Sequence, residues 1–128
     1  MNVAPIAALY AGLLGLLLLA LSVLVIRQRL RAKLALGLGT DERLLRASRA
    51  QGNFVEYAPF ALLLLVLAEG QGMPGWTLHG LGISLLAGRL AHAANISSMP
   101  ERLLLRQIGM TLTFAVLGLL SAWLVVAR

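Results

Sequence analysis

The sequence predicts an all-α protein whose four helices form a bundle that spans a membrane. Of its 128 residues, 59% are hydrophobic and only 12% are charged. A soluble domain is about 45–50% apolar and about 25% charged. Residues 3–26 contain no charged side chain, and a membrane-spanning helix needs about 20 such residues. The chain length suits one domain over residues 1–128.

Four apolar segments follow one another and predict the helices. The first is longer than the apolar core of a signal peptide, and its basic flank follows it, so we interpret it as a helix of the mature protein. The other three are interrupted by a few polar residues. The expected helices cover residues 3–30, 41–69, 75–95 and 99–127.

The boundaries between these helices carry recognisable signals. Asp41 is a suitable N-cap for the second helix. The segment 70–75 is rich in Gly and Pro and separates the second helix from the third. Ser98 and Glu101 have the spacing of a capping box and predict the start of the fourth helix.

The basic residues are unevenly distributed along the chain. Residues 27–49 contain seven Lys or Arg against Asp41 and Glu42, whereas residues 69–75 contain no Lys or Arg. The positive-inside rule therefore places residues 27–49 in the cytoplasm and both termini outside it. The net charge of +6 then reflects membrane topology, and no nucleic-acid partner is expected.

Polar residues gather in the cytoplasmic halves of the last three helices. Such residues are costly inside a membrane, about 2.5–3.5 kcal/mol each at a helix centre, and they commonly mark function. Spacings of three and four place them on one face of each helix, and the three faces converge at the cytoplasmic ends. The groups are Arg46, Arg49, Asn53 and Glu56 on helix two, Arg89 and His92 on helix three, and Arg102 and Arg106 on helix four.

The excess of arginine in this cluster indicates an anionic ligand. Guanidinium groups form paired hydrogen bonds with carboxylate or phosphate, and Glu56 suits an ammonium group. A zwitterionic, peptide-like ligand with an extra carboxylate fits both features.

The same residues also have structural interpretations. Arg49 and Glu56 could neutralise each other, and Arg43 and Arg46 could anchor the helix at lipid headgroups. His92 alone is better explained as a buried hydrogen-bonding residue than as a metal ligand, and no metal is expected.

Other features limit the chemistry. The glycines at 82, 88, 109 and 118 indicate close helix packing. The sequence contains neither a glycine-rich nucleotide loop nor an ordered Ser-His-Asp set. It also contains no cysteine, so any thiol has to come from a bound molecule.

One segment resembles a known family. It reads Arg49-Ala50-Gln51-Gly52-Asn53-Phe54-Val55-Glu56-Tyr57-Ala58-Pro59 and is similar to the second-helix motif of the MAPEG family, the membrane-associated proteins of eicosanoid and glutathione metabolism. The arginine-rich end of helix one, the segment Gly88-Arg89-Leu90-Ala91-His92 and an arginine early in helix four extend the resemblance.

The resemblance implies a bacterial member of the family. It implies a four-helix bundle assembled as a homotrimer in the inner membrane, with the cofactor glutathione bound between subunits near the cytoplasmic side. Arg106 matches the family arginine that stabilises the glutathione thiolate. The positions that match glutathione-binding residues are Arg27, Arg49, Gln51, Asn53, Glu56, Tyr57 and His92.

The function expected on this basis is that of a glutathione transferase or peroxidase. Its partners are the lipid bilayer, the other copies of the trimer and a lipophilic electrophile. Two alternatives stay open. The first is a non-catalytic binding or structural protein, which gains support because two family tyrosines fall here on Asn95 or Ile96 and on Met110. A small multidrug transporter also has four helices, but it carries its glutamate on helix one.

Overall fold

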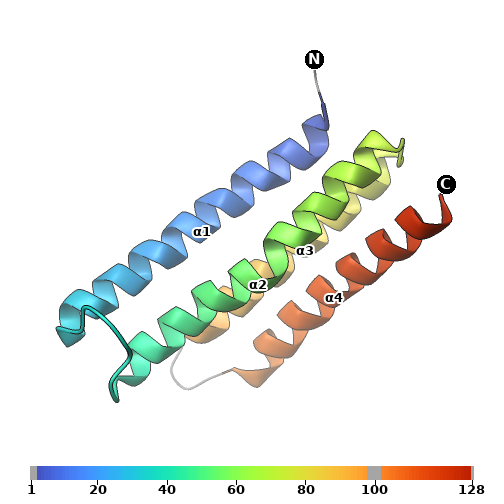
Figure 1. Ribbon diagram of the computed structural model, residues 1–128. Coiled ribbons are helices and arrows are strands. Elements are labelled where there is room, and N and C mark those ends of the chain that lie inside the picture. The colour runs from blue at the N-terminus through green and yellow to red at the C-terminus, as the bar shows by residue number, and fades with distance from the viewer. Residues whose placement is uncertain (1–2, 98–101, 128) are drawn as a thin grey trace.

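A computed structural model describes residues 3–97 and 102–127 and shows four antiparallel helices (Figure 1). The expectation of a four-helix, all-α fold is confirmed. The helices are α1 (Pro5–Ala32), α2 (Glu42–Gly70), α3 (Gly75–Ser97) and α4 (Leu103–Val126). α2 and α3 contact each other, and each of them also contacts α1 and α4. α1 and α4 do not contact each other in the described part of the chain.

Each described boundary has a local cause. Asp41 accepts a hydrogen bond from the Leu44 backbone N–H at 2.9 Å, which confirms it as the N-cap of α2. Gly72 has a φ of 87° in the turn after α2, a conformation that favours glycine. α4 begins at Leu103 instead of residue 99, because Arg102 is still extended. The expected capping box of Ser98 and Glu101 lies outside the described residues.

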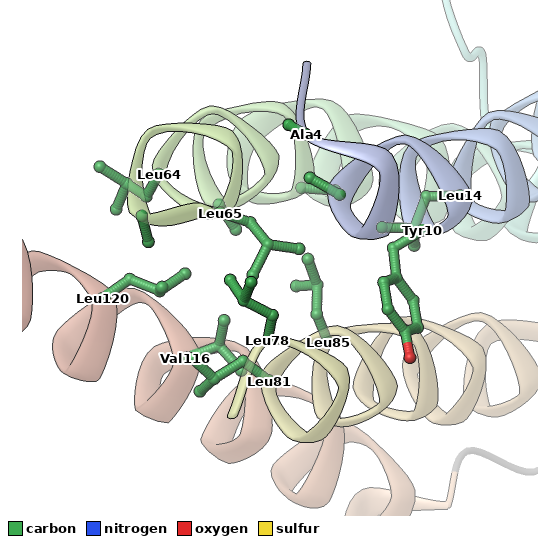
Figure 2. Close-up of a cluster of buried hydrophobic side chains, with 14 of the residues drawn as sticks. Ala4, Tyr10, Leu14, Leu64, Leu65, Leu78, Leu81, Leu85, Val116 and Leu120 are labelled. Carbon is green, nitrogen blue, oxygen red and sulfur yellow. The ribbon is translucent and has the colours of Figure 1, made fainter. Parts of the chain in front are cut away.

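The two ends of the bundle differ in composition. We call the end with both termini and the α2–α3 turn the apolar end (Figure 1). There, leucines of α2, α3 and α4 lie between the helices, and Tyr10 extends from α1 toward α3 (Figure 2). The opposite end, with the α1–α2 loop, is the basic end. Its apolar cluster contains only three buried residues, Val25, Leu44 and Ala47.

The α1–α2 loop at the basic end is held by arginines. Arg29 Nη1 donates to the Gly37 carbonyl oxygen at 2.7 Å, and Arg31 forms an ion pair with Asp41 at 2.6 Å. Part of the positive charge of residues 27–49 therefore has a structural role in addition to its expected effect on topology.

Membrane-spanning character is clear in three of the helices described. α1, α2 and α4 are long and apolar enough to cross a membrane, and α3 is not among them. The prediction of four apolar spans is therefore correct for three. α3 differs because it carries Arg89, His92 and Asn95, which are buried inside the bundle. Its polar residues face protein, so their presence does not require α3 to lie outside the membrane.

Close helix contacts occur at three of the four predicted glycines. A methyl group on Gly82 would overlap the Tyr10 ring, and one on Gly109 would lie 2.7 Å from the Gly88 carbonyl oxygen. At Gly118, in contrast, no side chain or other helix of the described chain lies within 4 Å. The packing interpretation is thus confirmed at three positions and unsupported at Gly118.

Candidate functional site

A cavity of about 220 Å³ opens at the basic end, between α2, α3 and α4. It is bounded by side chains that sequence spacing had placed on converging helix faces. Its lining consists of Leu45, Arg46, Arg49, Asn53, His92, Asn95 and Arg106. Three of these seven residues are arginines and none carries a carboxylate, so the lining favours an anion.

α2 contributes one face of this cavity. Arg46, Arg49 and Asn53 follow one another at helical spacing and line the same space. Arg46 also forms an ion pair with Glu42 at 3.7 Å. Arg49 lies 3.5 Å from Glu56, two turns further along the same helix.

The Arg49–Glu56 pair is well exposed to solvent. The two side chains are 59% and 50% exposed, respectively, and such pairs contribute little stability, about 0–1 kcal/mol. The two charges therefore pair within α2, and the pair contributes little to the free energy of unfolding. Both charges are accessible to a ligand.

α3 contributes the buried part of the lining. His92 is 4% exposed and Asn95 is fully buried. The Gly88–Gly109 contact brings α3 against α4 here, and His92 Cβ would lie 3.0 Å from a methyl group on Gly109. Asn95 Oδ1 accepts the Arg102 backbone N–H at 2.7 Å, which connects the end of α3 to the start of α4.

α4 contributes one of its two early arginines. Arg106 lines the cavity, whereas Arg102 does not. Both side chains are exposed. The sequence had placed both on one helix face, and the structure distinguishes them.

Arg89 lies apart from the cavity, although spacing had grouped it with His92. It is 2% exposed. Its Nη1 donates to Asn53 Oδ1 at 2.5 Å and to the Asn53 carbonyl oxygen at 3.4 Å. Its Nη2 donates to Met110 Sδ at 3.5 Å. Arg89 thus joins α3 to α2 and α4 directly behind one wall of the cavity.

Four of the predicted glutathione-binding residues do not line the cavity. Gln51 donates to Ser22 Oγ of α1 at 2.9 Å. Tyr57 packs edge-on against Phe114 of α4, with ring centroids 5.4 Å apart. Glu56 reaches the site only through Arg49.

Arg27 is the fourth of these residues and lies at a different place. It lines an apolar groove of about 410 Å³ with residues of α1 and α3, among them Leu24, Leu90 and Ala94. A single chain therefore brings together Arg46, Arg49, Asn53, His92 and Arg106, but leaves Arg27 outside this cavity.

Titratable groups near the basic end also stabilise the fold. The Leu44 backbone N–H and the Arg31 guanidinium hold the pKa of Asp41 below its ordinary value of 3.8.

Within residues 3–97 and 102–127, no group of three His, Cys, Asp or Glu side chains could hold a metal ion.

Comparison with known proteins adds information that the geometry lacks. A model of the MAPEG family matches residues 7–126. The chain is also similar to inner membrane protein YecN of Escherichia coli strain K12, with 45% identity over 87 residues. YecN of Escherichia coli O6:H1 matches equally well. The match covers 68% of this chain and 66% of YecN, just under two thirds of its length. No solved structure matches the chain significantly.

Proposed function

This chain belongs to the MAPEG family, which includes glutathione-dependent enzymes, and we propose that it is an integral membrane glutathione transferase or peroxidase. The observation that carries the proposal is the cavity between α2, α3 and α4. Among the described residues, its lining has three arginines and no carboxylate, and it contains Arg49 and Asn53 of the family motif.

The donor set at the basic end fits glutathione. Glutathione has two carboxylates, one ammonium group, two peptide bonds and a thiol. Arg49 and Arg46 suit the carboxylates, and Glu56 suits the ammonium group. A zwitterion placed against Arg49 and Glu56 replaces one exposed ion pair by two, so the existing pair does not compete strongly.

The size of the cavity favours an oligomeric site. About 220 Å³ is less than the roughly 300–1,000 Å³ of typical ligand pockets. Arg27 lies on a separate groove of the same chain. In a homotrimer, α1 of one subunit brings its Arg27 to the cavity of the next, which enlarges the site and adds a carboxylate partner.

Arg106 is the residue proposed to act on the thiol. Bound glutathione supplies a sulfur nucleophile, and a guanidinium beside a thiol lowers its pKa and increases the thiolate fraction. The lipophilic electrophile reaches the sulfur from the bilayer. Because the chain has no cysteine, its own side chains do not compete for the electrophile as thiols.

The membrane orientation is part of the proposal. The related YecN is named an inner membrane protein, and we assign this chain to the bacterial inner membrane. The seven basic residues within 27–49 support a cytoplasmic location for the basic end, with both termini outside the cytoplasm.

The proposal is tested with purified protein in detergent. Glutathione binding is measured by titration calorimetry, and thiolate formation by ultraviolet absorbance. Arg106→Gln should abolish the thiolate signal at neutral pH and weaken binding by about tenfold, because one charge-assisted hydrogen bond is lost. Arg102→Gln is the control, since it removes an exposed arginine one turn earlier that does not line the cavity.

Failure of the wild-type protein to bind glutathione would overturn the proposal. Binding without a thiolate signal or turnover would instead support a non-catalytic binding protein. One observation favours this second candidate. Asn95 and Met110, which match or adjoin the positions of the family tyrosines, form hydrogen bonds within the bundle.

A further inference from the structure

Arg89 is the most deeply buried charged residue in the described part of the chain, at 2% exposure. The acceptors recorded for it are the Asn53 side-chain and backbone oxygens and the Met110 sulfur, all of them neutral. Its Nε is buried without a hydrogen-bond partner among the described residues. Burial of a cation on neutral acceptors is costly, which suggests that this arginine serves a purpose other than stability.

The contact with Asn53 determines how its side-chain amide is oriented. An arginine carries only hydrogen-bond donors, so its partner has to offer an acceptor. Asn53 therefore directs Oδ1 toward Arg89, at 2.5 Å from Nη1. The amide nitrogen Nδ2, with its two hydrogens, is left for other partners.

Asn53 also lines the cavity that holds Arg49 and Arg106. With its oxygen directed toward Arg89, the polar group that the side chain directs away from Arg89 is an N–H donor. The same amide turned over would offer an acceptor beside the arginines of the lining. Among the described residues, Arg89 is the only hydrogen-bond partner of the Asn53 side chain that distinguishes these two orientations.

We infer that Arg89 is a positioning residue that fixes Asn53 as a hydrogen-bond donor toward the cavity. Through this contact it selects a ligand with an acceptor oxygen, a carboxylate or a peptide carbonyl, at the Asn53 position. This inference rests on the proposed function for the identity of the ligand, but the orientation of Asn53 is measurable without any ligand.

The first experiment observes the Asn53 amide directly. The chain has only three asparagines, at positions 2, 53 and 95, so selective ¹⁵N-asparagine labelling gives three side-chain NH₂ signal pairs. The Asn53 pair is assigned as the one that disappears in Asn53→Asp. In Arg89→Met, which removes all guanidinium donors, this pair should shift and exchange its two hydrogens faster, while the Asn95 pair stays in place.

A conservative variant separates positioning from packing. Arg89→Lys keeps one cationic donor and should restore a slowly exchanging Asn53 pair. Wild-type-like Asn53 signals in Arg89→Met would overturn the inference. If Arg89→Met does not fold, Arg89→Lys is compared with the wild type. Its Asn53 pair should exchange slowly but shift in position, because an ammonium group replaces the guanidinium, while the Asn95 pair stays in place. An unshifted Asn53 pair would overturn the inference.

The second experiment uses glutathione as the probe. Asn53→Asp keeps an acceptor for Arg89 and the size of the side chain, but its second oxygen replaces the N–H donor toward the cavity. Glutathione affinity should fall by at least about tenfold, with no loss of thermal stability. If the wild type binds glutathione and Asn53→Asp binds it with the same affinity, the inference is overturned.

These outcomes separate the two proposals. If the wild-type protein does not bind glutathione, the proposed function fails, and the NMR signals of Asn53 still decide whether Arg89 orients it.

Discussion

At the apolar end of the bundle, polar contacts join side chains to partners on other helices. Glu69 at the end of α2 accepts the backbone N–H groups of Ile6 and Ala7 at 3.0 and 2.7 Å. The Tyr10 hydroxyl lies 2.9 Å from His79 Nδ1. These contacts join α1 to α2 and to α3. The surrounding side chains are predominantly apolar.

At the basic end, the arginines face a cavity. Arg46, Arg49 and Arg106 line a space in which no described lining residue carries a carboxylate, and the nearby Glu56 is half exposed. The difference shows how to interpret polar residues at membrane depth. A polar group matched by one partner across a helix interface supports the fold, whereas several side chains of the same charge that line one space indicate a ligand.

The largest expected effect is on folding at the apolar end. Gly82→Ala places a methyl group inside the Tyr10 ring, which cannot move without losing its contact with His79. Overpacking of this kind should cost about 3 kcal/mol, measured as the unfolding free energy in detergent. The folded fraction should bind glutathione normally.

Gly80→Ala is the matched control for this prediction. Gly80 lies two residues earlier on α3 and no side chain or other helix lies within 4 Å of its added methyl group. Equal destabilisation by both substitutions would show that the Tyr10 contact is not the cause.

A second prediction concerns Glu69. Glu69→Ala removes the acceptor of two N–H groups at the start of α1 and should reduce the unfolding free energy by about 2 kcal/mol. Glu69→Gln retains one acceptor oxygen and should have an intermediate effect. A change in glutathione affinity with either variant would contradict the separation between the two ends.

The third prediction is made for the basic end. Arg49→Gln should raise the glutathione dissociation constant by about tenfold through loss of a charge-assisted hydrogen bond. Its thermal midpoint should barely change, because the Arg49–Glu56 pair is exposed. Arg43→Gln, another exposed arginine of α2 that does not line the cavity, is the control for net charge. Equal loss of affinity in both variants would favour nonspecific electrostatics over a defined site.

The smallest effect is expected from Asp41. Its pKa in the folded protein is lowered by the Leu44 N–H and by Arg31, so ionised Asp41 stabilises the fold above its unfolded pKa. This contribution is lost as the pH falls through the lower, folded value. Asp41→Asn keeps an N-cap but removes the charge.

The stability difference between Asp41→Asn and the wild type should therefore shrink as the pH is lowered through 3.8. Thermal midpoints at several pH values measure it. A difference that grows on acidification would mean that the assigned sign is wrong.

Much of the basic end could be predicted from the sequence. Helical spacing placed Arg46, Arg49 and Asn53 on one face, and the structure brings them to one cavity with His92 and Arg106. The motif around Asn53 also indicated the family, which the family match confirms. These inferences succeeded because they depend on the period of one helix and on the order of helices in an up-and-down bundle.

The remaining features depend on which neighbour a side chain reaches. Arg89 shares a face with His92 but extends between helices to Asn53, and Gln51 turns toward Ser22 instead of the cavity. Helical period determines the direction of a side chain to within a broad sector. It does not determine the distance to another helix or the acceptor available there. The role of Glu69 escaped prediction for the same reason, since its partners are 62 and 63 residues away.

The contact of Glu69 with α1 also has a consequence for biogenesis. The first N–H groups of α1 receive their side-chain acceptor only after α2 has been synthesised and has returned to the same end of the bundle. The first turn of α1 therefore has its side-chain cap only as part of a helical hairpin with α2. Removal of α2 would leave these two N–H groups of α1 without their side-chain acceptor.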